Sequence, residues 1–355
     1  MSEKASALHS PYIIDGVQQD LTPAQLLDAA TVGPVSRSSD MRDFLPVADE
    51  TLEPLARIID FDSGDIHDYL SMVCSTRRML SLAYAATYTR QRMATALIDA
   101  MWNKGKFRLE DLSLIPSWKW NEAPVGAMAA FYESASAASE YADALGLWFD
   151  SYSYSAVEGE GSLEFSIVST EFEKLRAVPA EAQNDAGSWL IYIPFDSSDY
   201  RLGGSLLAQS IGLAGAVPKC DDVRTFVECY EVVREFVEDG VLLSAATVGE
   251  GGLLPAVKSL LGTKMDMETD ISDILRAYQE KSAVRVLFSE VPGVVIQIRD
   301  YDFDYVDAEL LLQDVLYFPL GHPVPGSGEV RVKHSHKSAI ETILDSLMRN
   351  AEGED

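Results

Sequence analysis

Hydrophobic residues recur at helical spacing in two long stretches of the first half of the chain. In residues 66–102 they return every three or four positions, and the part 84–100 contains many small residues and neither Gly nor Pro. Residues 127–145 repeat this pattern, with Phe131 and Tyr132 as the bulky members among alanines. We therefore expect a long, closely packed helix in each stretch.

Runs dense in β-branched and aromatic residues follow, and the alternation then begins again. Residues 163–168 and 189–193 are typical of strands. Beyond Gly203-Gly204 the pattern predicts helices at 206–213, 224–237 and 255–261 and strands at 241–244, 284–288 and 293–298. Helices interleaved with strands in two successive blocks indicate an α/β (α+β) protein of two lobes.

The two blocks suggest where the lobes begin and end. A chain of 355 residues can form two domains, each with its own core. The start of the chain is rich in Ser, Pro and Gln, which is typical of an arm that lies over another surface. The expected division is an N-terminal arm or linker at 1–40, a first lobe at 41–182, a second lobe at 183–335, and a C-terminal helix (338–349) with an acidic tail within 336–355.

The charge balance excludes two classes of partner. The chain has 28 Lys and Arg against 56 Asp and Glu, which gives a formal net charge of −28. Such a surface repels phosphate backbones and anionic lipids, and no basic run offsets it, so we expect neither direct nucleic-acid binding nor membrane binding. The acidity still allows three explanations: solubility, a salt-rich cell, or a basic partner protein.

The cysteines and the N-terminal sequence bear on location. Cys74, Cys220 and Cys229 form no CxxC pair, so neither a zinc site nor a disulfide framework is indicated, and Cys220 and Cys229 are expected to be packing residues. The first residues lack the apolar core of a signal peptide, and no run of about 18 apolar residues occurs. We expect a cytoplasmic protein.

Four aspartates, Asp300, Asp302, Asp304 and Asp307, have a spacing that partly matches a calcium-binding loop. The Gly and the distal Glu of that motif are missing. The spacing is more typical of the acidic first turn of a helix, where the helix dipole favours negative charge.

Six segments resemble, in the same order, segments of the synthetase core of phosphoribosylformylglycinamidine synthase (FGAM synthase). The strongest is YRLGGSLLAQSIG at 200–212, which is similar to the family's RLGGSALAQ. The others are PSWKW at 116–120, AAFYESASAASEYADALGL at 129–147, DSYSYS at 150–155, DGVLLSAATVGEGGLLPAVKSLL at 239–261 and LFSEVPGVVIQI at 287–298. Together they cover roughly residues 40–320 and resemble the C-terminal half of that core.

The resemblance implies a fold and a set of partners. Its fold is the two-lobed fold of the aminoimidazole ribonucleotide synthetase-like superfamily, with a first-lobe sheet that pairs with a second half and an α/β second lobe. This chain matches one half only. The expected partner is therefore another copy in a homodimer, a second synthetase-like half, or a larger protein complex.

The resemblance also implies a Mg²⁺-nucleotide site that has lost residues. At the family's HDRSDGG turn this chain has Ala246, Thr247 and Gly249 in place of the His, the first Asp and the Ser. At the family's GEALTN segment, the Glu and Asn positions are Thr95 and Asp99.

Some matching positions keep suitable residues. The nucleotide-binding candidates are Gly249, Gly251, Gly252, Asp150 and Ser151, although the Gly-Lys that precedes the last pair in the family's GKDSMSM loop is absent. The metal-ligand candidates are Asp43 and Asp99. The glycines either cradle a phosphate or form only a tight strand-to-helix turn inherited with the fold.

These losses point to a catalytically degenerate FGAM synthase-like subunit, a pseudoenzyme with a structural or regulatory role. No catalytic residue is assigned, and no cofactor is expected beyond residual ADP or ATP with Mg²⁺. Two alternatives stay open. One is the non-catalytic half of a split FGAM synthase in purine biosynthesis, part of an ATP-dependent amidoligase, and the other is a nucleotide-binding module.

Overall fold

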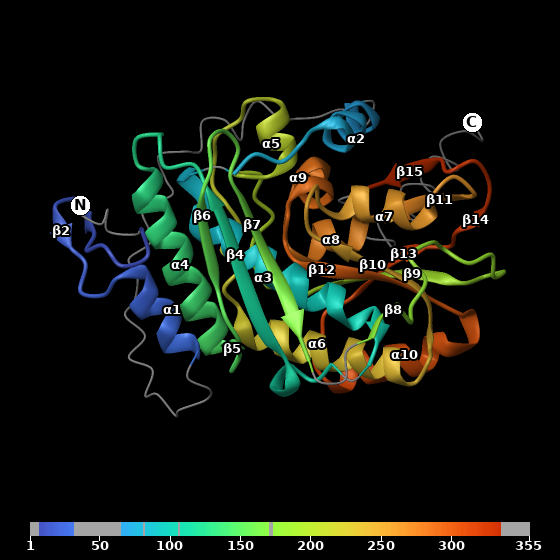
Figure 1. Cartoon of the computed structure of the whole chain (residues 1–355). Coiled ribbons are helices and arrows are strands. Elements are labelled where there is room, and N and C mark those ends of the chain that lie inside the picture. The colour runs from blue at the N-terminus through green and yellow to red at the C-terminus, as the bar shows by residue number, and fades with distance from the viewer. Residues whose placement is uncertain (1–6, 32–64, 81, 106, 170–172, 335–355) are drawn as a thin grey trace, which may run out of the picture.

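The structure is a computed structural model, which describes residues 7–31, 65–80, 82–105, 107–169 and 173–334. Figure 1 shows two sheets with helices packed around them, the first sheet from the first half of the chain and the second from the second half. The predicted C-terminal helix at 338–349 and the metal-ligand candidate Asp43 lie outside the described residues.

The first sheet is built around β4 (Ser113–Trp120). It pairs in parallel with β5 (Trp148–Phe149) and β6 (Ser153–Ala156) and antiparallel with β7 (Ser162–Val168). The predicted helix at 127–145 is confirmed as α4 (Ala127–Ala144), whereas the stretch 66–102 contains two helices, α2 (Asp65–Ser75) and α3 (Ala85–Met101), with the 3-10 turn η3 (Leu82–Tyr84) just before α3.

One face of this sheet is buried by aromatic contacts with α4. Trp118 and Trp120, on β4, are fully buried and both pack on the ring of Phe131, with centroid distances of 5.9 and 5.7 Å. Edge-to-face and tilted aromatic pairs of this kind add to the free energy gained from burial. The helical anchor expected at Phe131 is therefore what fixes α4 on the sheet.

The other face of the first sheet is polar. Because side chains alternate along a strand and the register pairs Ser117 with both Ser153 and Glu164, these residues share one face. Ser153 donates a hydrogen bond to Ser117 at 2.9 Å. The same face carries Ser113, Lys119, Ser155, Ser162 and Ser166, together with the apolar Ile115 and Val168. Polar side chains therefore predominate on this face.

The described part of the N-terminal arm packs on the first lobe. A hairpin of β1 (Ile13–Ile14) and β2 (Val17–Gln18) turns at Asp15-Gly16, both in the left-handed region, as an Asp-Gly hairpin requires. Helix α1 (Pro23–Thr31) then lies against α4 and β5, where Ser139 donates a hydrogen bond to the Leu26 carbonyl at 2.7 Å. The arm covers another surface, as predicted, but part of it is a helix rather than a linker.

The second sheet has four strands, all antiparallel to their neighbours. Its order is β10 (Leu242–Val248), β12 (Gly293–Ile298), β9 (Trp189–Pro194) and β13 (Phe318–Gly321). Every residue of β12 is buried. A smaller sheet joins β11 (Met265–Asp270) with β14 (Val324–Pro325) and β15 (Val330–Lys333), and a two-stranded pair joins β3 (Asn103–Lys104) with β8 (Glu173–Arg176).

Helices at the three positions predicted after residue 200 are present as α5 (Leu206–Ser210), α6 (Val223–Glu238) and α7 (Leu253–Leu261), and α8 (Ser272–Ala277) was not predicted. Helix α10 (Phe303–Leu312) follows these, and α2 packs beside α5 and α7. The acidic segment at 300–307 forms the 3-10 turn η5 (Asp300–Asp302) and the first turn of α10, as expected.

One predicted strand is wrong. Residues 284–288 belong to the short helix α9 (Ala283–Phe288). Ser282 caps this helix, because its hydroxyl accepts a hydrogen bond from the Arg285 amide at 3.4 Å. Four of its residues, Val284, Val286, Leu287 and Phe288, are buried. A short apolar run of β-branched residues has the same pattern in a buried strand and in a buried helix. Tertiary packing, not the local pattern, therefore determines that this segment is a helix.

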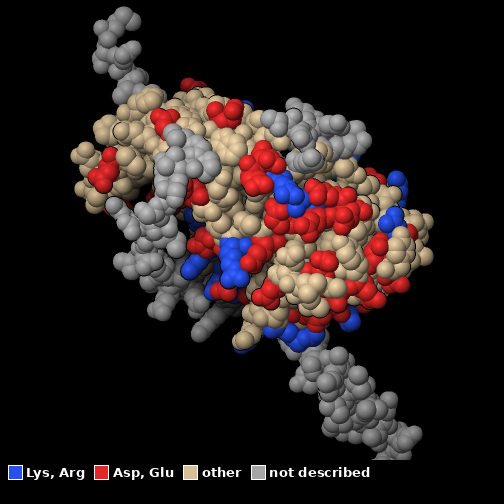
Figure 2. Space-filling model, turned by 90° about the horizontal axis from the view of Figure 1, so that it is seen from below, with Lys and Arg blue, Asp and Glu red and all other residues tan. Residues whose placement is uncertain are grey.

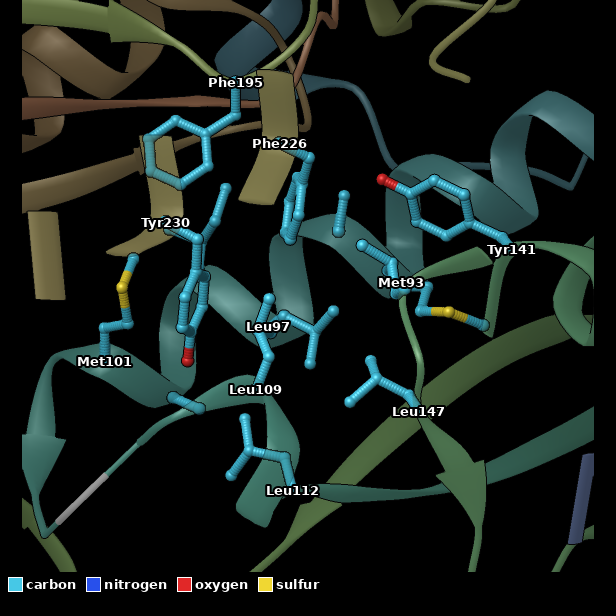
Figure 3. Packing of buried hydrophobic residues seen from close by; sticks show 14 of the residues in the cluster. Met93, Leu97, Met101, Leu109, Leu112, Tyr141, Leu147, Phe195, Phe226 and Tyr230 are labelled. Carbon is cyan, nitrogen blue, oxygen red and sulfur yellow. The ribbon is translucent and has the colours of Figure 1, made fainter. Parts of the chain in front are cut away.

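Helix α3 lies in a core that is shared between the lobes. In Figure 3, Met93 and Leu97 of α3 face Phe226 and Tyr230 of α6, and Leu112 approaches from the first lobe. All of these side chains belong to one cluster of buried hydrophobic residues. A helix held on both sides in this way presents its remaining polar side chains in fixed positions.

Among the helices in the described ranges, none combines the length and apolar character needed to cross a lipid bilayer.

Candidate functional site

Helix α3 and strand β10 bring together the residues that the family resemblance assigned to metal binding. The Thr247 hydroxyl donates to Asp99 Oδ1 at 2.5 Å and accepts a hydrogen bond from Trp102 Nε1 at 2.8 Å. Gly249 of the same segment packs against Thr95 of α3, because a Cβ at position 249 would lie 2.5 Å from Thr95 Cγ2. The two short segments, far apart in sequence, therefore meet at the matched positions.

The electrostatics of Asp99 reflect its place between these elements. Partial removal from water raises the pKa of its carboxyl, while the Thr247 hydrogen bond and the charges of Arg176 and Arg92 act to lower it. The pKa of Asp99 is raised, so the loss of hydration outweighs the opposing hydrogen bond and charges. Arg176 is held nearby because its guanidinium donates to the backbone carbonyls of Val178 and Ala245.

A pocket of about 400 Å³ opens beside Asp99, between α3 and the edge strand β7. Its α3 wall includes Arg92, Thr95 and Asp99, and Asn103 follows just beyond the helix. The β7 wall includes Glu164 and Ser166. The lining offers hydrogen-bond donors and acceptors to a polar ligand.

The glycine turn connects β10 to α7, as the inherited-turn interpretation predicts. Gly251 and Gly252 have φ of 87° and 91°, which side chains other than glycine rarely adopt. A Cβ on Gly252 would lie 2.7 Å from the Phe288 Cα, so this turn also needs the small residue for close packing against α9. Gly249 lies at its start, next to α3.

A carboxylate of the chain itself accepts a hydrogen bond from the glycine turn. Glu290 Oε1 accepts hydrogen bonds from the Gly251 amide and from the Leu206 amide at the start of α5, each at 2.8 Å. Glu290 is only 4% exposed. Backbone N–H groups at such turns bind anions well, and here the anion is supplied by the chain itself.

Arg78 balances this buried carboxylate. Its guanidinium forms an ion pair with Glu290 Oε2 and donates to the Gly204 carbonyl at 2.6 Å. Gln91, on α3, donates to the Glu290 backbone carbonyl at 2.8 Å. The pair therefore ties the RLGGS turn, the glycine turn and α3 to one point.

Glu250, the acidic residue that precedes the glycine pair, is engaged by two arginines. Its carboxylate lies 3.9 Å from Arg78 Nε and 3.6 Å from Arg92 Nη1. These distances are those of ion pairs rather than short hydrogen bonds. The Nε atoms of both arginines are buried, and neither has a hydrogen-bond partner among the described residues.

The remaining nucleotide candidates lie elsewhere. Asp150 and Ser151 are exposed in the loop between β5 and β6, beside α1, where Tyr152 donates to Asp28 at 2.7 Å. The glycine turn instead lies beside α2 and α9. The structure therefore does not place the two groups in one neighbourhood, and their common role in nucleotide binding stays a prediction.

The described residues do not fit a Mg²⁺ ion. Mg²⁺ prefers carboxylate oxygens in octahedral geometry. Asp99 Oδ1 is committed to a hydroxyl, and Glu250 is paired with two guanidinium groups. Within the described parts of the chain, no three His, Cys, Asp or Glu side chains come close enough together to hold a metal ion.

Sequence reasoning missed the Arg78–Glu290 pair. A glutamate between the apolar runs LF and VPGVVIQI was a possible signal, because a buried Glu is rare unless it is paired. Nothing in the sequence identified its partner, which is 212 positions away.

The fold and site together define a mixed α/β protein with a glycine turn closed by its own carboxylate. No family model matches the chain. It is 24% identical to phosphoribosylformylglycinamidine synthase of Homo sapiens over 249 residues, 65% of this chain and 18% of that protein. With the probable chloroplastic/mitochondrial enzyme of Arabidopsis thaliana the identity is 27% over 258 residues, 69% of this chain and 18% of that protein. The chain is thus distantly similar to FGAM synthases over about two thirds of its length, and it spans less than a fifth of the length of these two relatives.

Solved structures with a similar arrangement include Thermotoga maritima PurL complexed with FGAR. It has 15% sequence identity and a TM-score of 0.49, over 70% of this chain and 40% of that chain. The hydrogenase maturation protein HypE has 12% identity and a TM-score of 0.48, over 70% of this chain and 79% of that chain.

Proposed function

We propose that this chain is a catalytically degenerate FGAM synthase-like subunit with a structural or regulatory role in a larger assembly. The observation that carries the proposal is the Thr247–Asp99 hydrogen bond. A carboxylate at position 247 would offer a second anionic oxygen beside Asp99, whereas a threonine hydroxyl consumes one of the oxygens that Asp99 has.

The closed glycine turn supports the same proposal. A phosphate that approached the Gly251 amide would have to displace Glu290, which would leave Arg78 without its buried partner. Losing a partner from a buried ion pair costs about 3–5 kcal/mol. The turn is thus better suited to joining elements than to binding a nucleotide.

Its assembly partner also belongs to this proposal. A second synthetase-like half or another copy would pair across the first-lobe sheet, and the serine-rich face makes such an interface polar and hydrated rather than apolar. Such an interface is consistent with a partner that dissociates.

The direct test is turnover. Purified chain is incubated with ATP, Mg²⁺, formylglycinamide ribonucleotide and ammonia, and phosphate release is measured. We expect the rate to equal that of an Asp99→Ala control, because phosphoryl transfer requires bound metal ions and cations that can meet the phosphates, whereas Asp99 is hydrogen-bonded to Thr247 and Arg92 is paired with Glu250. Release that exceeds the control would contradict the proposal.

A nucleotide-binding module is the second candidate, and the pocket beside Asp99 is the observation that favours it. A volume of about 400 Å³ is within the size range of small-molecule sites. In this case ADP should raise the melting temperature of the chain, and Arg92→Ala, in the pocket wall, should abolish the increase. Absence of any increase would leave the structural role as the sole proposal.

A further inference from the structure

Helix α10 carries apolar residues on two faces, and only one of them is buried. Val306 and Leu310 are fully buried, and Phe303 packs on the Trp189 ring at 4.9 Å. Most surface helices instead present a charged or polar face to solvent. The outward face of α10 therefore requires an explanation.

The exposed face follows a helical repeat. Tyr305, Ala308 and Leu312 occur at i, i+3 and i+7 of α10, which places them in one row, and Tyr301 precedes them in η5; we call these four residues the α10 stripe. Tyr301 is 76% exposed, Tyr305 41% and Leu312 79%. This spacing is the one by which helices present anchors to a groove or to another helix.

More apolar surface surrounds the end of the stripe. Leu311 is 64% exposed, and Leu316, just beyond the helix, is 48% exposed. A cluster of large exposed apolar residues on one element differs from single ones scattered over a surface, and it is typical of an interaction site.

Acidic side chains of α6 flank the stripe. The Tyr305 hydroxyl donates to Asp239 at 2.9 Å, and its ring packs on Phe236 of α6. Glu235 and Glu238 lie on the same helix end and share the buried Arg234. Figure 2 shows the face that α6 and α10 form at the bottom of Figure 1, with acidic side chains gathered in large patches.

Charge decides among the possible occupants. A second copy docking through this face would bring two acidic surfaces together, and nucleic acid or an anionic membrane would be repelled. A partner surface with both apolar and basic residues could bury apolar area against the leucines and form ion pairs with the carboxylates.

We propose that the α10 stripe is a docking surface for an amphipathic helix of a partner protein, with an apolar face that packs on Tyr301, Tyr305 and Leu312 and basic residues that approach the carboxylates of α6. The proposal is independent of the nucleotide site, because α10 takes no part in it.

The probe is a synthetic amphipathic helix of about four turns, with leucines on one face and lysines beside them. Its binding to the full chain is measured by fluorescence anisotropy at low and at high salt. Two controls are a peptide with the same residues in scrambled order and one with glutamate in place of lysine. We expect binding by the ordered basic peptide alone, with an affinity that falls as salt screens the charges.

Variants locate the site. Tyr301→Ser with Leu312→Ser should weaken binding at least about tenfold. Ile13→Ser with Val17→Ser alters two exposed apolar residues of the β1–β2 hairpin, far from α10 in the sequence, and should leave the affinity unchanged. Both double variants should melt like the parent, since all four side chains are exposed. The proposal is overturned if the ordered peptide does not bind, if the scrambled or acidic peptide binds equally well, or if the stripe variant keeps the parent's affinity.

Discussion

Glu290 shows how much one buried charge can organise. Its carboxylate accepts amides from the glycine turn and from α5, and Arg78 neutralises it. Replacing it with Gln keeps an acceptor for the amides but leaves the guanidinium without a counter-charge. We predict that Glu290→Gln lowers the free energy of unfolding by about 3–5 kcal/mol, measured by urea denaturation.

Its matched control is an exposed pair. Glu160 lies 3.5 Å from Arg77 at the surface, with side-chain exposures of 48% and 86%. Glu160→Gln should change the free energy of unfolding by no more than about 1 kcal/mol. Equal effects of the two substitutions would show that Glu290 is not the organising residue.

Asp99 gives a prediction that depends on pH. Burial raises the pKa of its carboxyl above the ordinary value, so the charged form is disfavoured in the folded chain. The Asp99 carboxylate therefore lowers the free energy of unfolding at a pH above its folded-state pKa. This loss of stability disappears as the pH falls from the folded-state pKa to the pKa of the unfolded chain. Asp99→Asn should raise the melting temperature at neutral pH, with the difference vanishing in acid.

Asp266 is the control of opposite sign. The Glu329 and Ser327 amides donate to its carboxylate at 2.7 Å and lower its pKa. Its contribution is favourable above the unfolded pKa and is lost as the pH falls through the folded pKa. Asp266→Asn should therefore lower the melting temperature at neutral pH and converge with the parent in acid. A parallel response of the two variants would refute both assignments.

The sequence predicted some of these residues and not others. Asp99 and Gly249–Gly252 follow from local matches to family segments, and the structure brings Asp99 and Gly249 near Thr95. Arg78 and Glu290 could not be paired in advance, because an ion pair depends on which distant segments the fold brings together. Asp150 and Ser151 matched a motif, yet they lie with β5 and β6 beside α1.

At the scale of elements, α10 ends in a strained position. Asp314 has φ of 57°, and the Val315 and Asp314 amides donate to the Leu310 and Leu311 carbonyls, which is the Schellman pattern. Glycine adopts this conformation without steric cost. We predict that Asp314→Gly raises the free energy of unfolding by about 0.5–1 kcal/mol.

Ala308→Gly, in the interior of the same helix, is the matched control. Added backbone freedom there should lower stability by about 1 kcal/mol. Urea denaturation of the two variants should thus give opposite signs. A loss of stability in both would contradict the interpretation of Asp314.

Elements with a long periodic pattern were predicted best. Helices α3, α4 and α6 span enough turns for their spacing to be unambiguous. Helix α9 is six residues long and fully apolar on its packed side, so no period was available to separate it from a strand. Helix α1 was hidden in a segment whose composition suggested a linker.

At the scale of the whole molecule, one hydrophobic core joins the two sheets through α3. The helix that presents Thr95 and Asp99 is therefore fixed from both sides. A site on a rigid element can be rebuilt by side chains alone, without moving the backbone. Under the proposed function, the difference between this chain and a nucleotide-binding synthetase half is then a matter of side chains, which is the central claim.

That claim is tested by restoring the lost groups. The variant combines Ala246→His, Thr247→Asp, Gly249→Ser and Thr95→Glu; the last also removes the branched side chain that would meet a Cβ at 249. Each regained charge-assisted contact contributes about 1.5–3 kcal/mol, which together suffices for an affinity in the micromolar range.

The decisive measurement is calorimetry of ADP binding with and without Mg²⁺. The account predicts Mg²⁺-dependent binding by the restored variant and no binding by the parent at the same concentrations. Tight Mg²⁺-dependent binding by the parent would contradict it. So would a correctly folded variant, with the parent's circular dichroism spectrum and melting transition, that binds no ADP.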